Sequence, residues 1–212
     1  MTTPVLPRLG LLGGTFDPPH VGHLAAARAV RDAVSGIEIS LVVANDPWQK
    51  SDARQITNAS LRVMMTRALV NHEPQMSVDD REVRRGGPTY TVDTLTELHA
   101  ENSQRELFLI VGADTASRIH TWHRSQDLIP LSTLIVVNRP GTSINLAPEM
   151  AAWNHIVVPM NPVDVSSTAI RTAVANGDSI STMTTPSVAA LISDNGLYRD
   201  RKSTRLNSSH LV

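Results

Sequence analysis

The sequence contains no cysteine among its 212 residues, and aromatic residues make up only 3% of it. Without cysteine there can be no disulfide framework, zinc–thiolate cluster or thiol nucleophile, so we expect a reducing cytoplasmic setting. An excess of charge of one sign is also missing, because 19 Lys and Arg stand against 20 Asp and Glu. A formal net charge of −1 excludes the broad basic surface that binds nucleic acid or anionic membranes. Any anion must therefore be bound by a few local groups.

Long hydrophobic runs are missing as well. The longest, such as residues 107–111, fall far short of the roughly 18 residues of a membrane-spanning helix, and residues 9–12 are too short for a signal-peptide core. We therefore expect a cytoplasmic protein with no membrane or nucleic-acid partner. The length predicts a single domain over residues 1–200, with a small helical lobe at about 160–200. Residues 201–212 are polar with little apolar content, and we expect a disordered or non-native tail.

Short apolar runs alternate with helical patterns along the chain, which is typical of strand–helix units around a parallel sheet. The predicted strands cover residues 9–12, 37–43, 107–111, 134–137 and 156–158. The predicted helices cover residues 21–34, 61–70, 92–98, 168–175 and 186–191. Their candidate N-caps are Asn58 or Ser60, Thr91, and Ser166 or Ser167. The polar stretch 79–88 precedes the third of these helices, and within it Arg84-Arg85 beside Gly86-Gly87 is interpreted as a solvated loop. The fold class is therefore α/β, a doubly wound parallel sheet with a C-terminal helical lobe.

The most informative segment is Gly13-Gly14-Thr15-Phe16-Asp17-Pro18-Pro19-His20-Val21-Gly22-His23-Leu24. Two glycines after a strand allow backbone N–H groups to approach an anion, and the N-terminus of the next helix adds its positive dipole. No Gly-Lys-Ser/Thr follows, so this is not a P-loop, and it is not the three-glycine dinucleotide fingerprint. His20 and His23 lie three residues apart at a helix start, so both rings can face the anion. Gly22 leaves room there for a ligand.

Other interpretations of this segment remain open. His20 alone could cap or pack, and His23 alone could be an ordinary core histidine. A metal site would need a third ligand, for which Asp17 is the local candidate. A metal-dependent hydrolase and a non-catalytic nucleotide sensor are therefore the competing functional classes.

The segment from Gly13 to Leu24 resembles the His-x-Gly-His nucleotidyltransferase superfamily, and within it the bacterial nicotinate-nucleotide adenylyltransferase family. Three further blocks are similar to that family: Gly87-Pro88-Thr89-Tyr90-Thr91-Val92-Asp93-Thr94, Val111-Gly112-Ala113-Asp114 with Trp122-His123, and Val165-Ser166-Ser167-Thr168-Ala169-Ile170-Arg171. The resemblance spans residues 9–198. It departs from the family at Pro47-Trp48-Gln49-Lys50, which lacks the usual histidine before the lysine, and at His123, where another aromatic residue is common.

The resemblance implies a Rossmann-like nucleotidyltransferase fold and the transfer of an adenylyl group from ATP to nicotinate mononucleotide. The product is deamido-NAD, a late intermediate in making NAD. The implied catalytic residues are His20, His23 and Arg171. The implied ATP-binding residues are Gly13, Gly14, Thr15, Phe16, Lys50, Gly112, Asp114, Ser167 and Thr168. The implied nicotinate-nucleotide-binding residues are Tyr90, Thr91, Trp122 and His123. Magnesium is expected on the ATP phosphates with no protein ligand, and a homo-oligomer is compatible with the family.

Several of these roles rest on the resemblance, because the residues alone allow others. Ser166 to Thr168 would serve equally as an N-cap, Asp114 as a turn residue and Trp122 as a core residue. Within the superfamily, the acceptor could instead be nicotinamide mononucleotide, phosphopantetheine or a cytidylyl acceptor. The Tyr90-Thr91 and Trp122 blocks argue against the last two.

Overall fold

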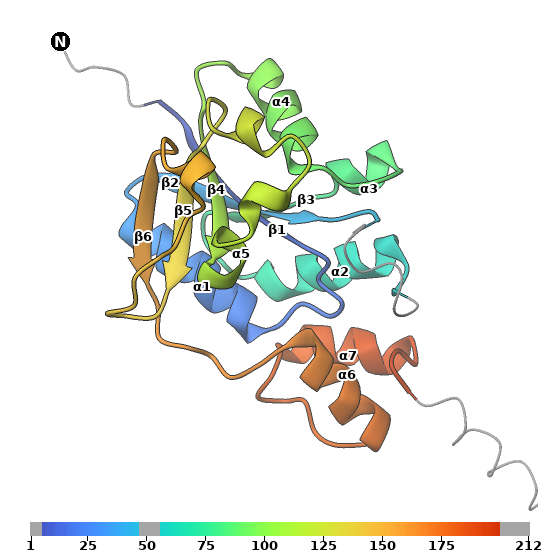
Figure 1. Ribbon diagram of the computed structural model, residues 1–212. Coiled ribbons are helices and arrows are strands. Elements are labelled where there is room, and N and C mark those ends of the chain that lie inside the picture. The colour runs from blue at the N-terminus through green and yellow to red at the C-terminus, as the bar shows by residue number, and fades with distance from the viewer. Residues whose placement is uncertain (1–5, 47–55, 200–212) are drawn as a thin grey trace, which may run out of the picture.

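The structure, a computed structural model, describes residues 6–46 and 56–199. Its centre is a six-stranded parallel sheet in the order β3-β2-β1-β4-β5-β6 (Figure 1). The strands are β1 (Arg8–Gly14), β2 (Ile37–Val43), β3 (Met76–Asp79), β4 (Glu106–Gly112), β5 (Thr133–Asn138) and β6 (His155–Pro159). The strand order reverses between β1 and β4, and ligands of doubly wound sheets bind outside the carboxyl ends of such neighbouring strands. The predicted fold class is confirmed.

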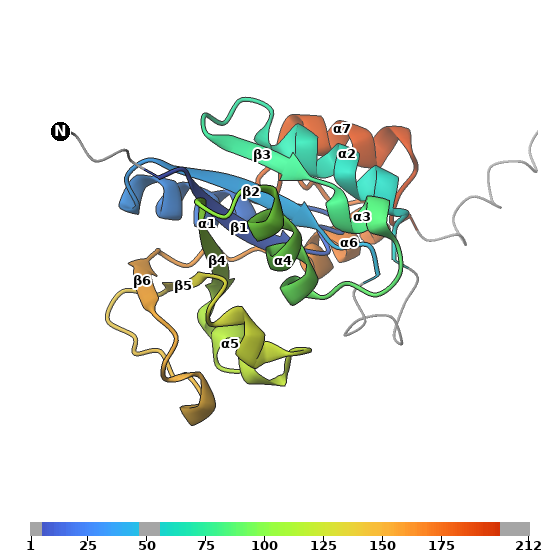
Figure 2. The same cartoon turned by 90° about the horizontal axis from the view of Figure 1, so that it is seen from above.

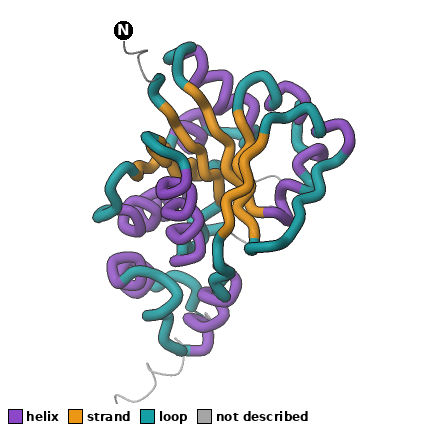
Figure 3. Tube along the Cα trace, turned by 90° about the vertical axis from the view of Figure 1, so that its left-hand side faces the viewer, coloured by secondary structure: helices purple, strands orange, loops and turns teal. Residues whose placement is uncertain are grey.

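Helices cover both faces of the sheet (Figures 2 and 3). The α-helices are α1 (Val21–Ala33), α2 (Ala59–Val70), α3 (Arg81–Arg85), α4 (Thr91–Glu101), α5 (Ala113–Ala116), α6 (Ser167–Asn176) and α7 (Pro186–Asp194). Short 3-10 helices are η1 (Ile119–Thr121), η2 (Ser125–Leu128) and η3 (Pro148–Met150). Successive strand residues point to opposite faces. Leu12 thus joins the core under α1, α2, α6 and α7, whereas Leu11 joins the core under α4 and α5.

The C-terminal helices α6 and α7 form a pair at one end of the molecule (Figure 1). Ser166 caps α6 by accepting a hydrogen bond from the Ala169 N–H, and Thr185 caps α7. The pair is not separate from the sheet, because Ile170 and Val188 are buried in the core under α1 and α2. α7 also packs directly on α2. No helix among the described residues is long and apolar enough to cross a membrane.

The structure corrects the sequence analysis between residues 76 and 91. Arg84 and Arg85, interpreted as part of a solvated loop, instead end the helix α3, and β3 before it pairs in parallel with β2. Strand β3 has only four residues, so its apolar content is too small to stand out as a run. Thr91 does not cap α4, because Tyr90 is the N-cap and Thr91 is the first helical residue. Asn58, by contrast, caps α2 as predicted, by accepting from the Ser60 N–H.

Candidate active site

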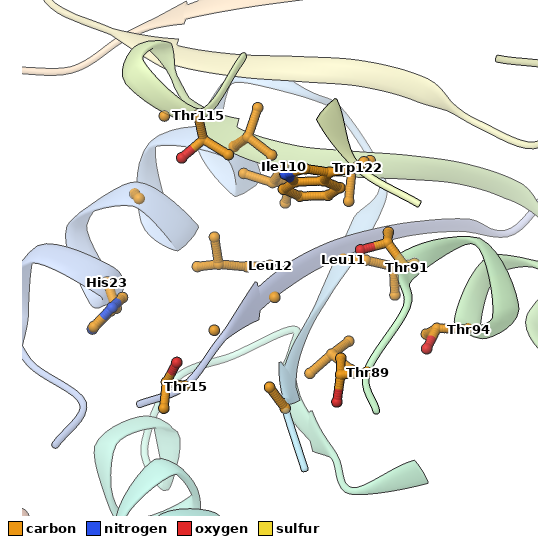
Figure 4. Close-up of a pocket in the computed structure, with 18 of the residues that line it drawn as sticks. Leu11, Leu12, Thr15, His23, Thr89, Thr91, Thr94, Ile110, Thr115 and Trp122 are labelled. Atoms are coloured by element: carbon orange, nitrogen blue, oxygen red, sulfur yellow. The ribbon is translucent and has the colours of Figure 1, made fainter. Parts of the chain in front are cut away.

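A cavity of about 660 Å³ opens at the carboxyl ends of β1 and β4, where the strand order reverses. The structure brings together in its lining many of the sequence-predicted residues: Gly13, Gly14, Thr15, His20, His23, Tyr90, Thr91, Gly112, Trp122 and His123. Figure 4 shows Thr15 and His23 toward one end, and Thr91 and Trp122 toward the other. We call these the phosphate end and the ring end of the cavity.

The turn at the phosphate end is shaped by close packing between Gly14 and the ring of Phe16. Phe16 is buried and has a left-handed backbone (φ 51°), which folds its ring back under the turn. A Cβ at Gly14 would lie 2.9 Å from that ring, so the glycine makes room for Phe16. The Phe16 ring in turn meets His23 edge-on, with centroids 4.9 Å apart. Phe16 therefore supports the cavity wall from behind and does not line it.

Arg62 holds the same turn from beneath, although the sequence analysis gave it no role. It is 1% exposed, and its guanidinium donates to the carbonyl oxygens of Thr15 (2.8 Å), Ala44 (2.6 Å) and Asn45 (2.8 Å). Its Nε donates to the Thr57 carbonyl oxygen at 2.9 Å. A guanidinium presents five N–H donors in a fixed plane, so one side chain can join three separate backbone segments. Arg62 thereby connects the end of β1 to the end of β2.

The two predicted catalytic histidines lie against each other at the start of α1. Their rings stack with centroids 3.7 Å apart, and the His20 N–H donates to His23 Nδ1 at 3.2 Å. Because Nδ1 accepts, a neutral His23 carries its proton on Nε2. Burial lowers the pKa of His20 to about 4, so His20 is uncharged at neutral pH. A Cβ at Gly22 would lie 3.0 Å from His20 Nδ1, so this glycine makes room for the His20 ring, and it also lines the cavity.

The ring end of the cavity is formed where α4 begins and η1 ends. The rings of Tyr90 and His123 pack against each other with centroids 4.2 Å apart. Thr91 is the first residue of α4, whose leading N–H groups have no partner within the helix. Trp122, partly exposed, follows η1 and contributes its indole to the same end (Figure 4). This end therefore offers aromatic faces and hydrogen-bond donors side by side.

A buried carboxylate lies at the ring end, and the sequence analysis missed it. Glu82 of α3 is 6% exposed, lines the cavity, and accepts a hydrogen bond from the Thr94 hydroxyl at 2.6 Å. The Thr94 oxygen in turn accepts from Arg85 at 3.0 Å. Burial raises the pKa of Glu82 to about 7, although the Thr94 hydrogen bond opposes that shift. Nothing in the polar stretch around Glu82 distinguishes it from its exposed neighbours, so no sequence signal could have singled it out.

Other predicted residues lie outside the cavity lining. Arg171 donates to the Asp17 carbonyl oxygen at 2.8 Å and to the Thr168 hydroxyl at 2.9 Å, and Ser167 donates to the Pro18 carbonyl oxygen at 2.8 Å. They therefore hold the loop that precedes His20. Asp114 is exposed on α5 and does not line the cavity. Lys50 falls outside the described residues. The ligand roles given to these residues stay predictions.

The family of the chain follows from proteins with similar sequences. The sequence profile of the cytidylyltransferase-like family matches residues 11–173. A probable nicotinate-nucleotide adenylyltransferase of Corynebacterium kroppenstedtii is 43% identical over 168 residues, covering 78% of each chain. One from Streptomyces coelicolor is 40% identical over 188 residues, covering 89% of this chain and 99% of the relative.

The chain belongs to the nicotinate-nucleotide adenylyltransferase family.

The fold of the family is shared with more distant solved structures. A nicotinic acid mononucleotide adenylyltransferase of Plasmodium falciparum, solved as a complex with NaAD, is similar with a TM-score of 0.73 at 17% identity, covering 90% of this chain and 97% of that one. A structure from Vibrio parahaemolyticus gives a TM-score of 0.66 at 18% identity, covering 91% and 96%. At these identities the likeness shows the shared fold.

Proposed function

We propose that this chain transfers the adenylyl group of ATP to nicotinate mononucleotide, giving deamido-NAD and pyrophosphate in the synthesis of NAD. The observation that carries the proposal is the two-ended cavity, in which a paired-histidine turn faces an aromatic, donor-rich helix start. A volume of about 660 Å³ is within the range of small-molecule sites. The phosphate end suits a polyphosphate and the ring end suits an aromatic ring, and a pyridine dinucleotide combines these two groups.

The reaction needs no general base on the protein. The phosphate of the mononucleotide is already ionised at pH 7, and it attacks the α-phosphorus of ATP in line while the bond to pyrophosphate breaks. The site must orient the two phosphates and stabilise the negative charge that spreads over the phosphorus oxygens. His23 supports this role with the proton on its Nε2. His20, uncharged in the free protein, would donate as a neutral imidazole or gain a proton as the anion arrives.

ATP would lie along the turn at the end of β1. Gly13, Gly14 and Thr15 would offer backbone N–H groups to the phosphates, and Gly112 would lie beside the nucleoside. We keep Lys50, Asp114, Ser167, Thr168 and Arg171 as further ATP ligands on the strength of the family motifs alone. To reach a phosphate, Arg171 and Ser167 would have to share or exchange their present acceptors, the carbonyl oxygens of Asp17 and Pro18.

Nicotinate mononucleotide would place its pyridine ring at the ring end, stacked on Trp122. The Thr91 hydroxyl and the first N–H groups of α4 would donate to the nicotinate carboxylate, with the backbone near Tyr90 and His123 adding to this set. A neutral amide satisfies such donors less well than an anion does, which would favour the acid over nicotinamide mononucleotide.

Magnesium would be held by phosphate oxygens and water in this reaction. Glu82 is the single carboxylate among the described lining residues, and it lies at the ring end. Among residues 6–46 and 56–199, no three His, Asp or Glu side chains gather as a metal site. The histidine and N–H donors of the phosphate end suit an anion and not Mg²⁺, which prefers oxygen ligands, so the ion would come with the ATP. When bound, it would neutralise part of the polyphosphate charge.

The deciding experiment measures pyrophosphate release from ATP and Mg²⁺ with either nicotinate or nicotinamide mononucleotide as acceptor. The acid should support rapid release, and His23→Ala should lower kcat by about 10³-fold because it removes a donor to the transition state. His155→Ala, at the far edge of the sheet, is the matched control and should keep full activity. Release with neither acceptor despite ATP binding would replace the proposal by a nucleotide sensor. A bound transition metal lost in His20→Ala would replace it by a metal-dependent hydrolase.

A further inference from the structure

The loop that precedes the histidines is held by the far end of the chain. Residues 17–21 connect the phosphate turn to α1, and each of the following bonds joins them to residues 167–198. Donors from the C-terminal segment are Ser167 Oγ to the Pro18 carbonyl (2.8 Å), Arg171 Nη1 to the Asp17 carbonyl (2.8 Å), Thr184 Oγ1 to the Pro19 carbonyl (3.0 Å) and Tyr198 OH to Asp17 Oδ1 (2.6 Å). In the reverse direction, the Val21 N–H donates to the Met183 carbonyl at 3.1 Å.

The composition of the loop explains why it needs donors from elsewhere. Pro18 and Pro19 have no N–H, so the loop cannot form a ladder of its own, yet both are buried together with Asp17. A buried carbonyl left without a donor is destabilising, because it has lost its hydrogen bonds to water. Donors from the C-terminal segment satisfy the carbonyls of Asp17, Pro18 and Pro19 in succession. Folding of the C-terminal segment onto the loop is therefore coupled to the loop's conformation.

We infer that Tyr198 and Thr184 are positioning residues of the adenylyl-transfer site, which hold residues 17–21 so that the His20 and His23 rings stack and face the cavity. Neither residue lies in the His-x-Gly-His segment or in the cavity lining. They act through the loop: Thr184 fixes the residue before His20, and Tyr198 fixes the start of the segment. The kinetic part of this inference rests on the proposed function, whereas the geometric part does not.

Tyr198 is well suited to a permanent contact. Asp17 is 1% exposed, and its second oxygen accepts from the Thr57 N–H at 3.4 Å. Burial and the Asp17 hydrogen bond raise the pKa of the Tyr198 phenol above its usual value, so the phenol keeps its proton and donates at any working pH. Its Oη also accepts from the Thr57 hydroxyl at 3.3 Å. Tyr198, Asp17 and Thr57 thus link the segment after α7, the loop at residues 17–21 and the segment before α2.

Thr184 acts one step closer to the histidines. It is 3% exposed, and its hydroxyl and the neighbouring Met183 carbonyl hold Pro19 and Val21, the residues on either side of His20. His20 is the N-cap of α1, and its N–H meets His23 Nδ1. A shift of Pro19 or Val21 would therefore move both imidazoles. Misplacement of a reacting group by about 1 Å costs on the order of 100-fold in rate.

The first test separates positioning from stability by kinetics. Tyr198→Phe and Thr184→Val should each lower kcat by about tenfold and leave the KM for nicotinate mononucleotide within about twofold, because Thr91 and Trp122 lie at the other end of the cavity from His23 (Figure 4). Thr184→Ser keeps the hydroxyl and should restore most of kcat. Val188→Ala, in the core of the same C-terminal segment, controls for stability and should lower Tm without the loss of kcat. An unchanged kcat in both Tyr198→Phe and Thr184→Val, or an equal loss in Val188→Ala, would overturn the inference.

The second test does not depend on catalysis. Imidazole nitrogen shifts in protein labelled with ¹⁵N-histidine report the bond between the His20 N–H and His23 Nδ1. Tyr198→Phe and Thr184→Val should move the His23 Nδ1 signal, whereas His155, whose Nδ1 lies 3.1 Å from the Trp153 carbonyl oxygen, should stay unchanged as an internal reference. A wild-type protein without adenylyl-transfer activity would disprove the proposed function and leave this readout intact. Unmoved His23 signals in both variants would disprove the positioning role itself.

Discussion

The two ends of the cavity are built in different ways. At the phosphate end, one continuous segment, residues 13–23, supplies the glycine turn and both histidines, Val165 lines the cavity beside Gly22, and remote residues hold the segment from behind. At the ring end, the lining comes from three separate segments around Glu82, Tyr90–Thr94 and Trp122. At the phosphate end, the groups proposed to act on the phosphates therefore lie in one segment, whose conformation is fixed by residues outside that segment. At the ring end, recognition of nicotinate mononucleotide is spread over several elements, so each side chain there contributes less to binding.

Each end also holds a titratable group, half-buried His20 and buried Glu82, and their pKa values shift in opposite directions. Burial lowers the pKa of His20 from 6.5 to about 4, and burial raises the pKa of Glu82 from 4.5 to about 7. In both cases burial disfavours the charged form. Both residues are therefore largely uncharged near pH 6, and the guanidinium of Arg118 places a fixed positive charge in the described lining of the cavity.

The largest expected effect comes from removing the support of the phosphate end. Arg62→Met leaves the carbonyl oxygens of Thr15, Ala44, Asn45 and Thr57 without their donor, and we expect the free energy of unfolding to fall by about 4 kcal/mol or more. Urea denaturation measures it. The matched control is Arg67→Met on the same helix, where an exposed ion pair with Asp80 is lost and the change should stay below about 0.5 kcal/mol. Similar losses of the free energy of unfolding in both variants would show that the buried hydrogen bonds of Arg62 stabilise the fold no more than an exposed ion pair does.

The opposite pKa shifts of His20 and Glu82 give the next largest expected effect, which is on the pH dependence of the free energy of unfolding. The folded state binds fewer protons than the unfolded chain at His20 between pH 4 and 6.5, so this residue makes stability rise with pH. At Glu82 the folded state binds more protons between pH 4.5 and 7, so stability falls as pH rises through that range. The two contributions are each on the order of 3 kcal/mol and should largely cancel in the wild-type protein.

Single variants should expose each contribution. In Glu82→Gln, which keeps an acceptor for Thr94, the free energy of unfolding should rise between pH 4 and 6.5; in His20→Gln it should fall between pH 4.5 and 7. Urea titrations across this pH range measure both slopes. Glu149→Gln, at an exposed residue of η3 away from Glu82, is the control and should follow the wild-type profile. If Glu82→Gln also followed it, the carboxyl would not be titrating as its burial demands.

The same contrast explains what could be predicted from the sequence. The predicted strands were found because each carries a dense apolar run, whereas Met76–Asp79 carries too few apolar residues to be recognised. The histidine segment was recognisable because its groups lie close together in sequence. Arg62 and Glu82 look like surface residues, since their burial depends on carbonyls and a hydroxyl that only the fold brings near. Ser167 was predicted at the phosphates, and in the structure it meets the Pro18 carbonyl, which no local pattern could indicate.

At the ring end, truncating the aromatic face should affect one substrate only. Trp122→Ala removes the surface proposed to stack on the pyridine ring, and we expect the KM for nicotinate mononucleotide to rise about tenfold. The KM for ATP should stay within about twofold, because Trp122 lies at the other end of the cavity from His23 (Figure 4). Trp122→Phe retains an aromatic face and should recover much of the loss. A rise in both KM values would mean that Trp122 maintains the whole cavity and does not serve one substrate.

The smallest effect should come from the exposed partner at the ring end. His123 packs on Tyr90 with ring centroids 4.2 Å apart but is exposed, so His123→Ala removes a contact worth about 0.6 kcal/mol. The KM for nicotinate mononucleotide should rise about threefold with kcat unchanged, which steady-state kinetics can resolve. His123→Phe should match the wild-type protein, since a ring of similar size preserves the contact. A loss of kcat in His123→Ala would instead show that this residue takes part in the reaction. The ring end would then contribute to turnover as well as to the binding of nicotinate mononucleotide.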